Sequence, residues 1–384
     1  MEITGIICEY NPFHIGHRKQ FSIIQQNNPE SAIVCLMSGN YVQRGMPAIF
    51  DKEIRAKAAI LSGADLVLEL PVTAALSSAE GFASEGVRIL SGFCDFLSFG
   101  AESPDRQKLI QAASVLLSDE FSKHLKMYLA DGISFPAARQ KALEHMGYDG
   151  TLLQSPNNIL AVEYCKAILS QNSKMIPQPI LRQGDFHAEL PDSENPSASS
   201  LRNLLESGKK CDAFIPESIV SCYENASVHT LLSAERAILY RLRTMADSEY
   251  DALPYGSEGL WRKLMKNARQ FDTLEKIITA TKSKRYTKTR IDRMIMCAFL
   301  GLSQCDLCSP APYIRVLAFN DKGREILIKA RESGSFPNLG EKQDDPFQKI
   351  EERQDDLYGL FAVSGTEPSG ITLDRRIFYH KSDS

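Results

Sequence analysis

The stretch that decides the fold is the amino terminus, which reads MEITGIICEYNPFHIGHRKQ over residues 1–20. The β-branched run from Ile3 to Ile7 predicts a short strand. Beyond it, Ile15, Phe21 and Ile24 recur at roughly helical spacing and predict a helix. The chain therefore opens as strand, loop and helix start.

Two histidines, His14 and His17, stand three residues apart at this helix start, with Gly16 between them. Both imidazoles are expected on one side of the first turn, where free N–H groups and the helix dipole favour an anion. Gly16 would let a ligand approach the backbone. The pattern indicates a nucleotide phosphate site, although a bare pair of this spacing could also be solvated or part of the core. It resembles the signature of HIGH-type nucleotidyltransferases, which include class I aminoacyl-tRNA synthetases and adenylyltransferases.

Composition places the chain among globular proteins. Its 384 residues, 43% of them hydrophobic, can bury a substantial core and suggest two or three domains. Neither an apolar run of about 20 residues nor a signal peptide is present, so we expect a cytoplasmic protein without a membrane partner. Nine scattered cysteines favour reduced thiols. The Cys305–Cys308 pair lacks a second pair at zinc spacing, and no metal site is predicted.

Strand-like and helical segments alternate through the first hundred residues. Apolar runs predict strands at Ser31–Met37, Asp65–Leu70, Cys94–Phe99 and, further on, Met175–Leu181. Asp51 is a good N-cap for the first intervening helix. This alternation predicts a Rossmann-like, doubly wound parallel sheet. Because GxGxxG does not follow the first strand and GxxxxGK[ST] is absent, dinucleotide redox chemistry and P-loop hydrolysis are disfavoured.

Three further loops carry candidate ligand-binding residues. Arg44, in the loop after the second strand, could hold a phosphate or a carboxylate or simply be solvated. The amides of Asn157 and Asn158 suit an adenine edge or a ribose, unless they only cap a helix that begins at Pro156. Near Ser199, serines precede a helix with Arg202 in its first turn, which predicts a second anion site.

The adenylation unit is expected to span residues 1–215, followed by a mainly helical, partly basic region at 216–384. From Glu235 to Arg293 there are fourteen Lys and Arg against eight Asp and Glu, although the whole chain has a net charge of −4. Basic residues around an aromatic favour contacts with an RNA loop over a merely solvated face. The predicted RNA-binding residues are Lys282, Lys284, Arg285, Tyr286, Lys288, Arg290 and Arg293.

Taken together, several segments resemble the bacterial tRNA(Met) cytidine acetate ligase family. They are Glu9–His17, Ser38–Gly45, Pro47–Lys52, Ser155–Leu160, Ser199–Arg202, Arg285–Arg293 and Tyr313–Leu327. The matches run in order across most of the chain. Tyr10 stands where phenylalanine is common in the family, and Ser199 belongs to a motif in which relatives often have threonine; neither departure removes a charge.

The resemblance implies an ATP-dependent ligase. Acetate and ATP, with the usual Mg²⁺, would give acetyl-adenylate and pyrophosphate, and N4 of the wobble cytidine in the elongator tRNA(Met) anticodon would take the acetyl group. His14 and His17 would be catalytic, with support from Ser199 and Arg202. The implied nucleotide site comprises Ile7, Cys8, Glu9, Tyr10, Asn11, Pro12, Phe13, His14, Ile15, Gly16, His17, Arg18, Lys19, Gln20, Gly100, Asn157, Asn158 and Arg182. No DNA partner is expected.

Two alternatives belong to other classes of function. An adenylyltransferase for a small phosphorylated cofactor precursor would release pyrophosphate in response to that phosphate and ignore RNA. A catalytically silent RNA-binding protein would tolerate the loss of both histidines. The basic segment disfavours the first alternative, and the paired anion sites disfavour the second.

Overall fold

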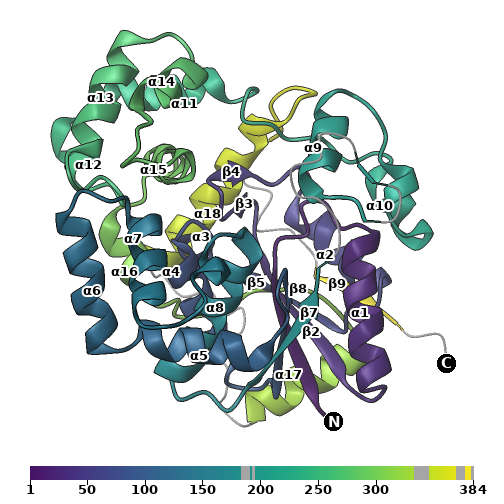
Figure 1. Cartoon of the computed structure of the whole chain (residues 1–384). Coiled ribbons are helices and arrows are strands. Elements are labelled where there is room, and N and C mark those ends of the chain that lie inside the picture. Colours follow the sequence, from purple (N-terminus) through teal and green to yellow (C-terminus); the bar gives the residue numbers. More distant parts are fainter. Residues whose placement is uncertain (183–190, 193–194, 333–345, 369–376, 382–384) are drawn as a thin grey trace.

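The computed structural model describes residues 1–182, 191–192, 195–332, 346–368 and 377–381. Its centre is a seven-stranded sheet in the order β7-β6-β1-β2-β5-β8-β9 (Figure 1). The strands are β1 (Ile3–Cys8), β2 (Ala32–Ser38), β5 (Leu66–Leu70), β6 (Phe96–Ala101), β7 (Ile176–Leu181), β8 (Val316–Asn320) and β9 (Phe378–His380). The predicted doubly wound Rossmann-like sheet is thus confirmed.

Alternate side chains of β1 point to opposite faces of the sheet, and each face is covered by a layer of helices. Ile3 and Ile7 pack into one core with α4 (Ala79–Leu90), α5 (Arg106–Leu116) and α8 (Pro156–Ser170). Ile6 and Cys8 face the opposite core with α1 (Ile15–Asn27) and α2 (Lys52–Leu61). Since successive side chains of a strand point to opposite faces, a strand apolar at nearly every position is buried on both.

The sheet is not parallel throughout. Strand β8 runs antiparallel to β5. The other five pairs of neighbouring strands in this sheet are parallel. Strands β8 and β9 come from beyond the predicted boundary at residue 215, and α17 (Asp321–Glu332) follows β8. The late strands cover an edge of β5 that would otherwise expose unpaired backbone groups.

A second core belongs to the helical region. It contains α11 (Glu235–Thr244), α13 (Leu260–Gln270), α14 (Leu274–Thr281), α15 (Lys288–Leu300) and α18 (Pro346–Tyr358), together with Tyr41, Val72 and Leu76 from the first hundred residues. This mainly helical part therefore packs directly on loops that leave the sheet.

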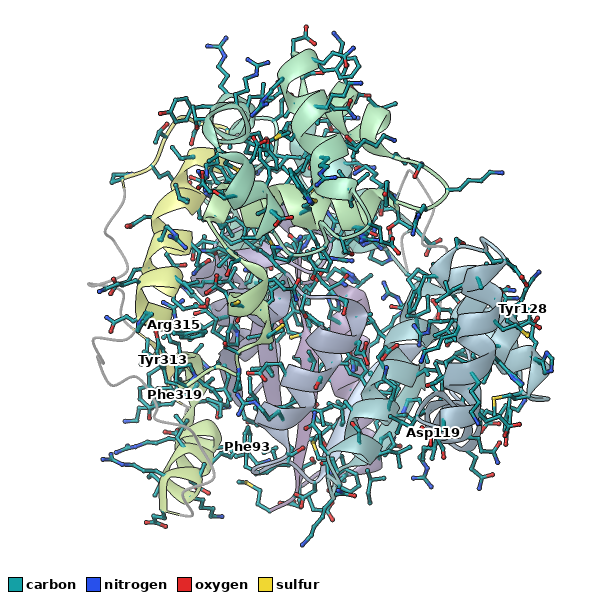
Figure 2. All side chains as sticks on the ribbon, turned by 90° about the vertical axis from the view of Figure 1, so that its left-hand side faces the viewer. Phe93, Asp119, Tyr128, Tyr313, Arg315 and Phe319 are labelled. Atoms are coloured by element: carbon teal, nitrogen blue, oxygen red, sulfur yellow. The ribbon has the colours of Figure 1, made fainter. Side chains whose placement is uncertain are left out.

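The remaining elements are shorter or peripheral. They are the hairpin of β3 (Tyr41–Val42) and β4 (Met46–Pro47), the helices α3 (Val72–Ala75), α6 (Asp119–Ala130), α7 (Phe135–His145), α9 (Ala198–Glu206), α10 (Val220–Tyr223), α12 (Asp247–Asp251) and α16 (Gln304–Cys308), and 3₁₀ turns at Gly150–Leu153, Asp212–Phe214, Glu217–Ile219 and Gly359–Phe361. In Figure 2, Asp119 and Tyr128 lie on the α6–α7 lobe, and Tyr313 and Arg315 lie on the other side of the molecule, beside α18. None of the helices described is long and apolar enough to cross a bilayer.

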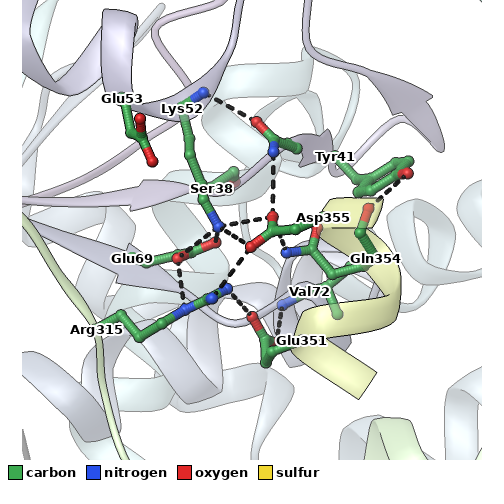
Figure 3. Close-up of polar contacts among 12 residues, drawn as sticks. Ser38, Tyr41, Lys52, Glu53, Glu69, Val72, Arg315, Glu351, Gln354 and Asp355 are labelled. Atoms are coloured by element: carbon green, nitrogen blue, oxygen red, sulfur yellow. Dashed lines mark hydrogen bonds and ion pairs between the residues drawn. The ribbon is translucent and has the colours of Figure 1, made fainter. Parts of the chain in front are cut away.

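A buried ionic network fastens α18 to the ends of β2 and β5 (Figure 3). The Lys52 ammonium lies 3.0 Å from Glu69 Oε1 and 2.7 Å from Asp355 Oδ2. Arg315 lies 2.6 Å from Glu351 and also pairs with Glu69 and Asp355. Burial is the main cause that raises the pKa of Glu351 to about 7.

The same network continues into the β3–β4 hairpin. Asn40 donates to Asp355 at 3.1 Å, and the Tyr41 hydroxyl donates to the Gln354 carbonyl at 3.0 Å. The late helix α18 thereby fixes the hairpin that follows β2.

Candidate functional site

The two histidines form the cap of α1. His14 is the N-cap, and its Nδ1 accepts a hydrogen bond from the Gly16 amide at 3.0 Å. His17 Nδ1 accepts from the His14 amide at 3.2 Å, and the ring centroids lie 3.8 Å apart. Because each Nδ1 accepts, the proton of each neutral ring is on Nε2. The motif therefore presents two neighbouring Nε2–H donors.

Burial keeps both imidazoles neutral. It lowers the pKa of His14 to about 3, helped by the nearby Arg182 and Arg202 guanidiniums. Burial, with His14 and Arg182, also lowers the pKa of His17. His14 is only 3% exposed, and its Nε2 has no hydrogen-bond partner in the described part of the chain. A buried donor without a partner is costly, which indicates a ligand acceptor at this point.

The structure gives a second reason for a glycine at position 16. A Cβ at this position would lie 2.8 Å from His14 Cε1 and 3.0 Å from His14 Nδ1. The glycine is thus needed for the His14 ring to fold back over the first turn.

The second predicted anion site meets the first. Ser197 caps α9, which begins at Ala198. Arg202 therefore lies in the second turn of this helix and not, as predicted, in the first, and it donates to Ser199 Oγ at 3.0 Å. The same guanidinium donates to the carbonyl of Asn11 at 2.8 Å. The structure therefore brings the start of α9 against the loop that carries His14.

A third set of candidate site residues lies near the end of β6. Arg182 packs near Gly100 and donates to Asn157 Oδ1 at 2.9 Å. Glu102 accepts from Asn157 Nδ2 and from the Asn158 amide, both at 2.7 Å. Glu102 was not predicted; its carboxylate sits at the amino end of α8, where the helix dipole favours a negative charge.

The two asparagines have different surroundings. Asn158 is 4% exposed; its Oδ1 accepts from the Ser103 amide at 2.9 Å and its Nδ2 donates to Ser155 Oγ at 3.3 Å. Asn157 is half-buried and contacts Arg182. Asn157 is therefore better placed to meet a ligand, whereas Asn158 joins two loops.

Several other residues of the predicted nucleotide site face away from it. Cys8, Tyr10 and Phe13 lie in the core that α1 and α2 share. Asn11 Oδ1 accepts from the Ile49 amide at 2.7 Å, and Arg18 donates to the Ser62 carbonyl at 2.5 Å. These contacts stabilise the loop and the helix that carry the histidines.

Arg55 is a buried residue that the sequence reasoning missed. Its guanidinium donates to the carbonyls of Glu9 at 2.7 Å and Ser38 at 3.1 Å, and also to that of Gly39. It thereby ties the ends of β1 and β2 together. An arginine in an amphipathic helix normally indicates a solvated face, so the sequence offered no signal for this role.

The structure divides the predicted RNA-binding residues. Lys282, Lys284, Arg285 and Lys288 are exposed, with Arg285 paired to Glu258 at 3.0 Å and Lys288 to Asp292 at 2.8 Å.

The other three members are partly engaged within the protein. Arg290 stacks on Tyr286, with Cζ 5.6 Å from the ring centroid, and Arg293 donates to the Gln43 carbonyl at 3.3 Å. The exposed lysines remain the most accessible candidates for a polyanion.

No metal centre is recognised among the residues described: no group of three or more His, Cys, Asp or Glu side chains is placed to hold an ion. Cys305 and Cys308 are exposed free thiols, and Cys8, Cys35, Cys94, Cys165, Cys211 and Cys297 are buried free thiols. Most of the cysteines are thus core residues.

Comparisons with known proteins agree with this geometry. Residues 1–367 match the family described as HIGH Nucleotidyl Transferase. A tRNA(Met) cytidine acetate ligase from Clostridium novyi is 36% identical, with 88% of this chain and 89% of that protein covered. One from Clostridium perfringens is 34% identical over 98% of this chain and 100% of the relative.

Two crystal structures of Thermotoga maritima TmcAL are also similar. The apo form has a TM-score of 0.91, and the form bound with alpha-thio ATP has a TM-score of 0.89. Each is 28% identical in sequence and covers 100% of both chains. Fold, capped histidines and matches together define a nucleotidyltransferase of the HIGH type. More narrowly, the chain belongs to the tRNA(Met) cytidine acetate ligase family.

Proposed function

We propose that this protein activates acetate with ATP and transfers the acetyl group to N4 of the wobble cytidine in elongator tRNA(Met). The observation that carries the proposal is the meeting of two helix starts at one site, with Arg202 bound to the Asn11 carbonyl and His14 Nε2 left without a partner among the residues that the structure describes. Family membership selects the substrates, since the matched relatives are named for tRNA(Met), cytidine and acetate.

In the first step, an acetate oxygen attacks the α-phosphorus of ATP, and the bond from that phosphorus to the bridging oxygen of the leaving pyrophosphate breaks. His14 and His17 would donate their Nε2–H groups to phosphate oxygens, and Arg202 with the start of α9 would stabilise the leaving charge. No protein nucleophile is required, so catalysis rests on positioning and on stabilising charge.

In the second step, N4 of the cytidine attacks the acetyl carbonyl carbon, AMP leaves with the former acetate oxygen, and the amine loses a proton. Arg182 and Asn157 would hold the nucleoside end, because Glu102 fixes Asn157 in place at 2.7 Å. Mg²⁺ would accompany ATP, bound chiefly by phosphates and water, as this ion commonly is.

We further propose that the tRNA reaches the site from the side of Lys282, Lys284 and Arg285, in the cytoplasm, where tRNA is found. Purified protein should be incubated with ATP, acetate and total tRNA, and the nucleosides should be separated by mass spectrometry. N4-acetylcytidine that requires all three substrates supports the proposal. Pyrophosphate release that depends on a small phosphorylated acceptor and ignores RNA would refute it.

A further inference from the structure

The turn of the β3–β4 hairpin is fixed on both sides of Arg44. The Gln43 amide donates to Glu9 Oε1 at 2.9 Å, and the Gln43 carbonyl accepts from Arg293 at 3.3 Å. The Gly45 amide closes the turn on the Val42 carbonyl at 2.9 Å. The backbone that carries Arg44 is therefore anchored both to the histidine loop and to α15.

The approach of α15 is close. A Cβ on Gly45, whose φ is +78°, would lie 2.4 Å from the Arg293 backbone nitrogen. Only a glycine fits both the left-handed backbone and the contact. The hairpin thus lies between the proposed adenylation site and the helix that begins with the basic residues Lys288 and Arg290.

Arg44 itself is exposed and has no hydrogen bond or ion pair in the described part of the chain. In contrast, Arg182 and Arg202 are mostly buried and bind Asn157 and Asn11. Burial lowers the pKa of both Arg182 and Arg202, and the Arg44 charge lowers each further. Arg182 and Arg202 thus lie near His14, and Arg44 is close enough to repel both of them, so an anion bound between the three guanidiniums would relieve this repulsion.

The order of the strands indicates which anion Arg44 would meet. Gly100 lies near the end of β6 and Arg182 directly after β7, both on one side of β1, whereas Arg44 follows β2, on the other side. In the proposed function, the starts of α1 and α9 bind the phosphates of ATP. A nucleophile attacks in line, opposite the leaving group, and must also be reachable by the incoming RNA. The position next to α15 meets the second requirement.

We propose that Arg44 binds the carboxylate of acetate and then the acetyl group of the adenylate, which makes the β3–β4 turn the acetate subsite. The inference rests on the proposed function and assigns the place of its smallest substrate. A guanidinium matches the two oxygens of a carboxylate in a bidentate pair.

The test is acetate-dependent exchange of pyrophosphate into ATP, which needs no tRNA, with R44A, R44K and R331A. Arg331 lies exposed near the end of α17, which Figure 1 shows at the end of the sheet opposite the hairpin. R44A should raise the KM for acetate about 10- to 100-fold, as expected for the loss of a charged hydrogen-bonded pair, and leave the KM for ATP near the wild-type value. The KM for acetate of R44K should lie between those of R44A and the wild type, because a lysine keeps the charge but cannot form the bidentate pair.

Rescue by free guanidinium distinguishes a direct role of Arg44 in acetate binding from a structural effect of its removal. Added guanidinium should lower the KM for acetate of R44A, and it should leave R331A and the wild type unchanged. An R44A variant with wild-type KM for acetate overturns the inference, and so does a parallel rise of both KM values, which would place Arg44 on a phosphate. Wild-type protein without acetate-dependent exchange would overturn the proposed function itself and the inference with it.

Discussion

The buried network around Lys52 gives a quantitative prediction about stability. Lys52 Nζ lies 3.0 and 3.1 Å from the two oxygens of Glu69 and 2.7 Å from both oxygens of Asp355. The three side chains are only 2%, 3% and 1% exposed. In Lys52→Met, the buried carboxylates of Glu69 and Asp355 would lose the ammonium, and Arg315 would be their remaining cation in this network, shared with Glu351. Removing one partner of a buried ion pair costs about 3–5 kcal/mol, and we expect a loss of free energy of unfolding in that range.

Urea unfolding followed by circular dichroism measures this loss. The matched control is Lys57→Met, which makes the same substitution at an exposed position of α2, where the ammonium lies 5.4 Å from the centroid of the Phe378 ring, and which should change the free energy of unfolding by less than about 1 kcal/mol. A proton on one carboxylate would relieve the repulsion in Lys52→Met, so the loss should be larger at about pH 8 than at about pH 5.5. A loss below about 1 kcal/mol, or one equal to the control, would refute this account of the network.

Three further predictions concern the site. Glu102→Gln should raise the KM for ATP about tenfold in pyrophosphate exchange, because Asn157 and the start of α8 lose their carboxylate; an unchanged KM would mean that Glu102 does not position the nucleotide site. The folded-state pKa of His14 is about 3, so the unfolded chain binds a proton there first as pH falls below about 6.5, and the contribution of His14 to the free energy of unfolding should fall by about 1.7 kcal/mol between pH 6.5 and 5. His14→Gln should flatten this slope in urea titrations, and an identical slope would contradict the neutral, buried imidazole. Gly45→Ala should lower the unfolding midpoint more than Gly132→Ala, since both glycines have positive φ (+78° and +77°) but only Gly45 has backbone atoms in the way; equal shifts would show that the contact with Arg293 is relaxed at little cost.

Much of the fold follows from local pattern. Runs such as Ala32–Ser38, buried at every position, and caps such as Asp51, which accepts from the Glu53 amide at 2.7 Å, are properties of short segments and could be predicted. The antiparallel pairing of β8 with β5 could not, because it joins segments about 250 residues apart in the chain.

The site was predictable to the extent that its residues sit at helix starts. His14 and His17 form a cap, Arg202 follows a serine cap, and the two helix starts lie against each other. Arg55 and Glu102 act through buried contacts with distant carbonyls and amides, which leave no periodic mark in the sequence. Likewise, the contact between Gly45 and Arg293 depends on packing between the two halves of the chain.

We propose that the nucleotide site and the basic helical region form one acetylating enzyme. The most direct measurement is a quantitative assay of N4-acetylcytidine in elongator tRNA(Met), run alongside pyrophosphate release, for the wild type and for His14→Ala/His17→Ala. We expect acetylation that requires ATP and acetate in the wild type and is lost in the double variant. Acetylation that persists in the double variant, or pyrophosphate release without acetylated tRNA in the wild type, would contradict the account.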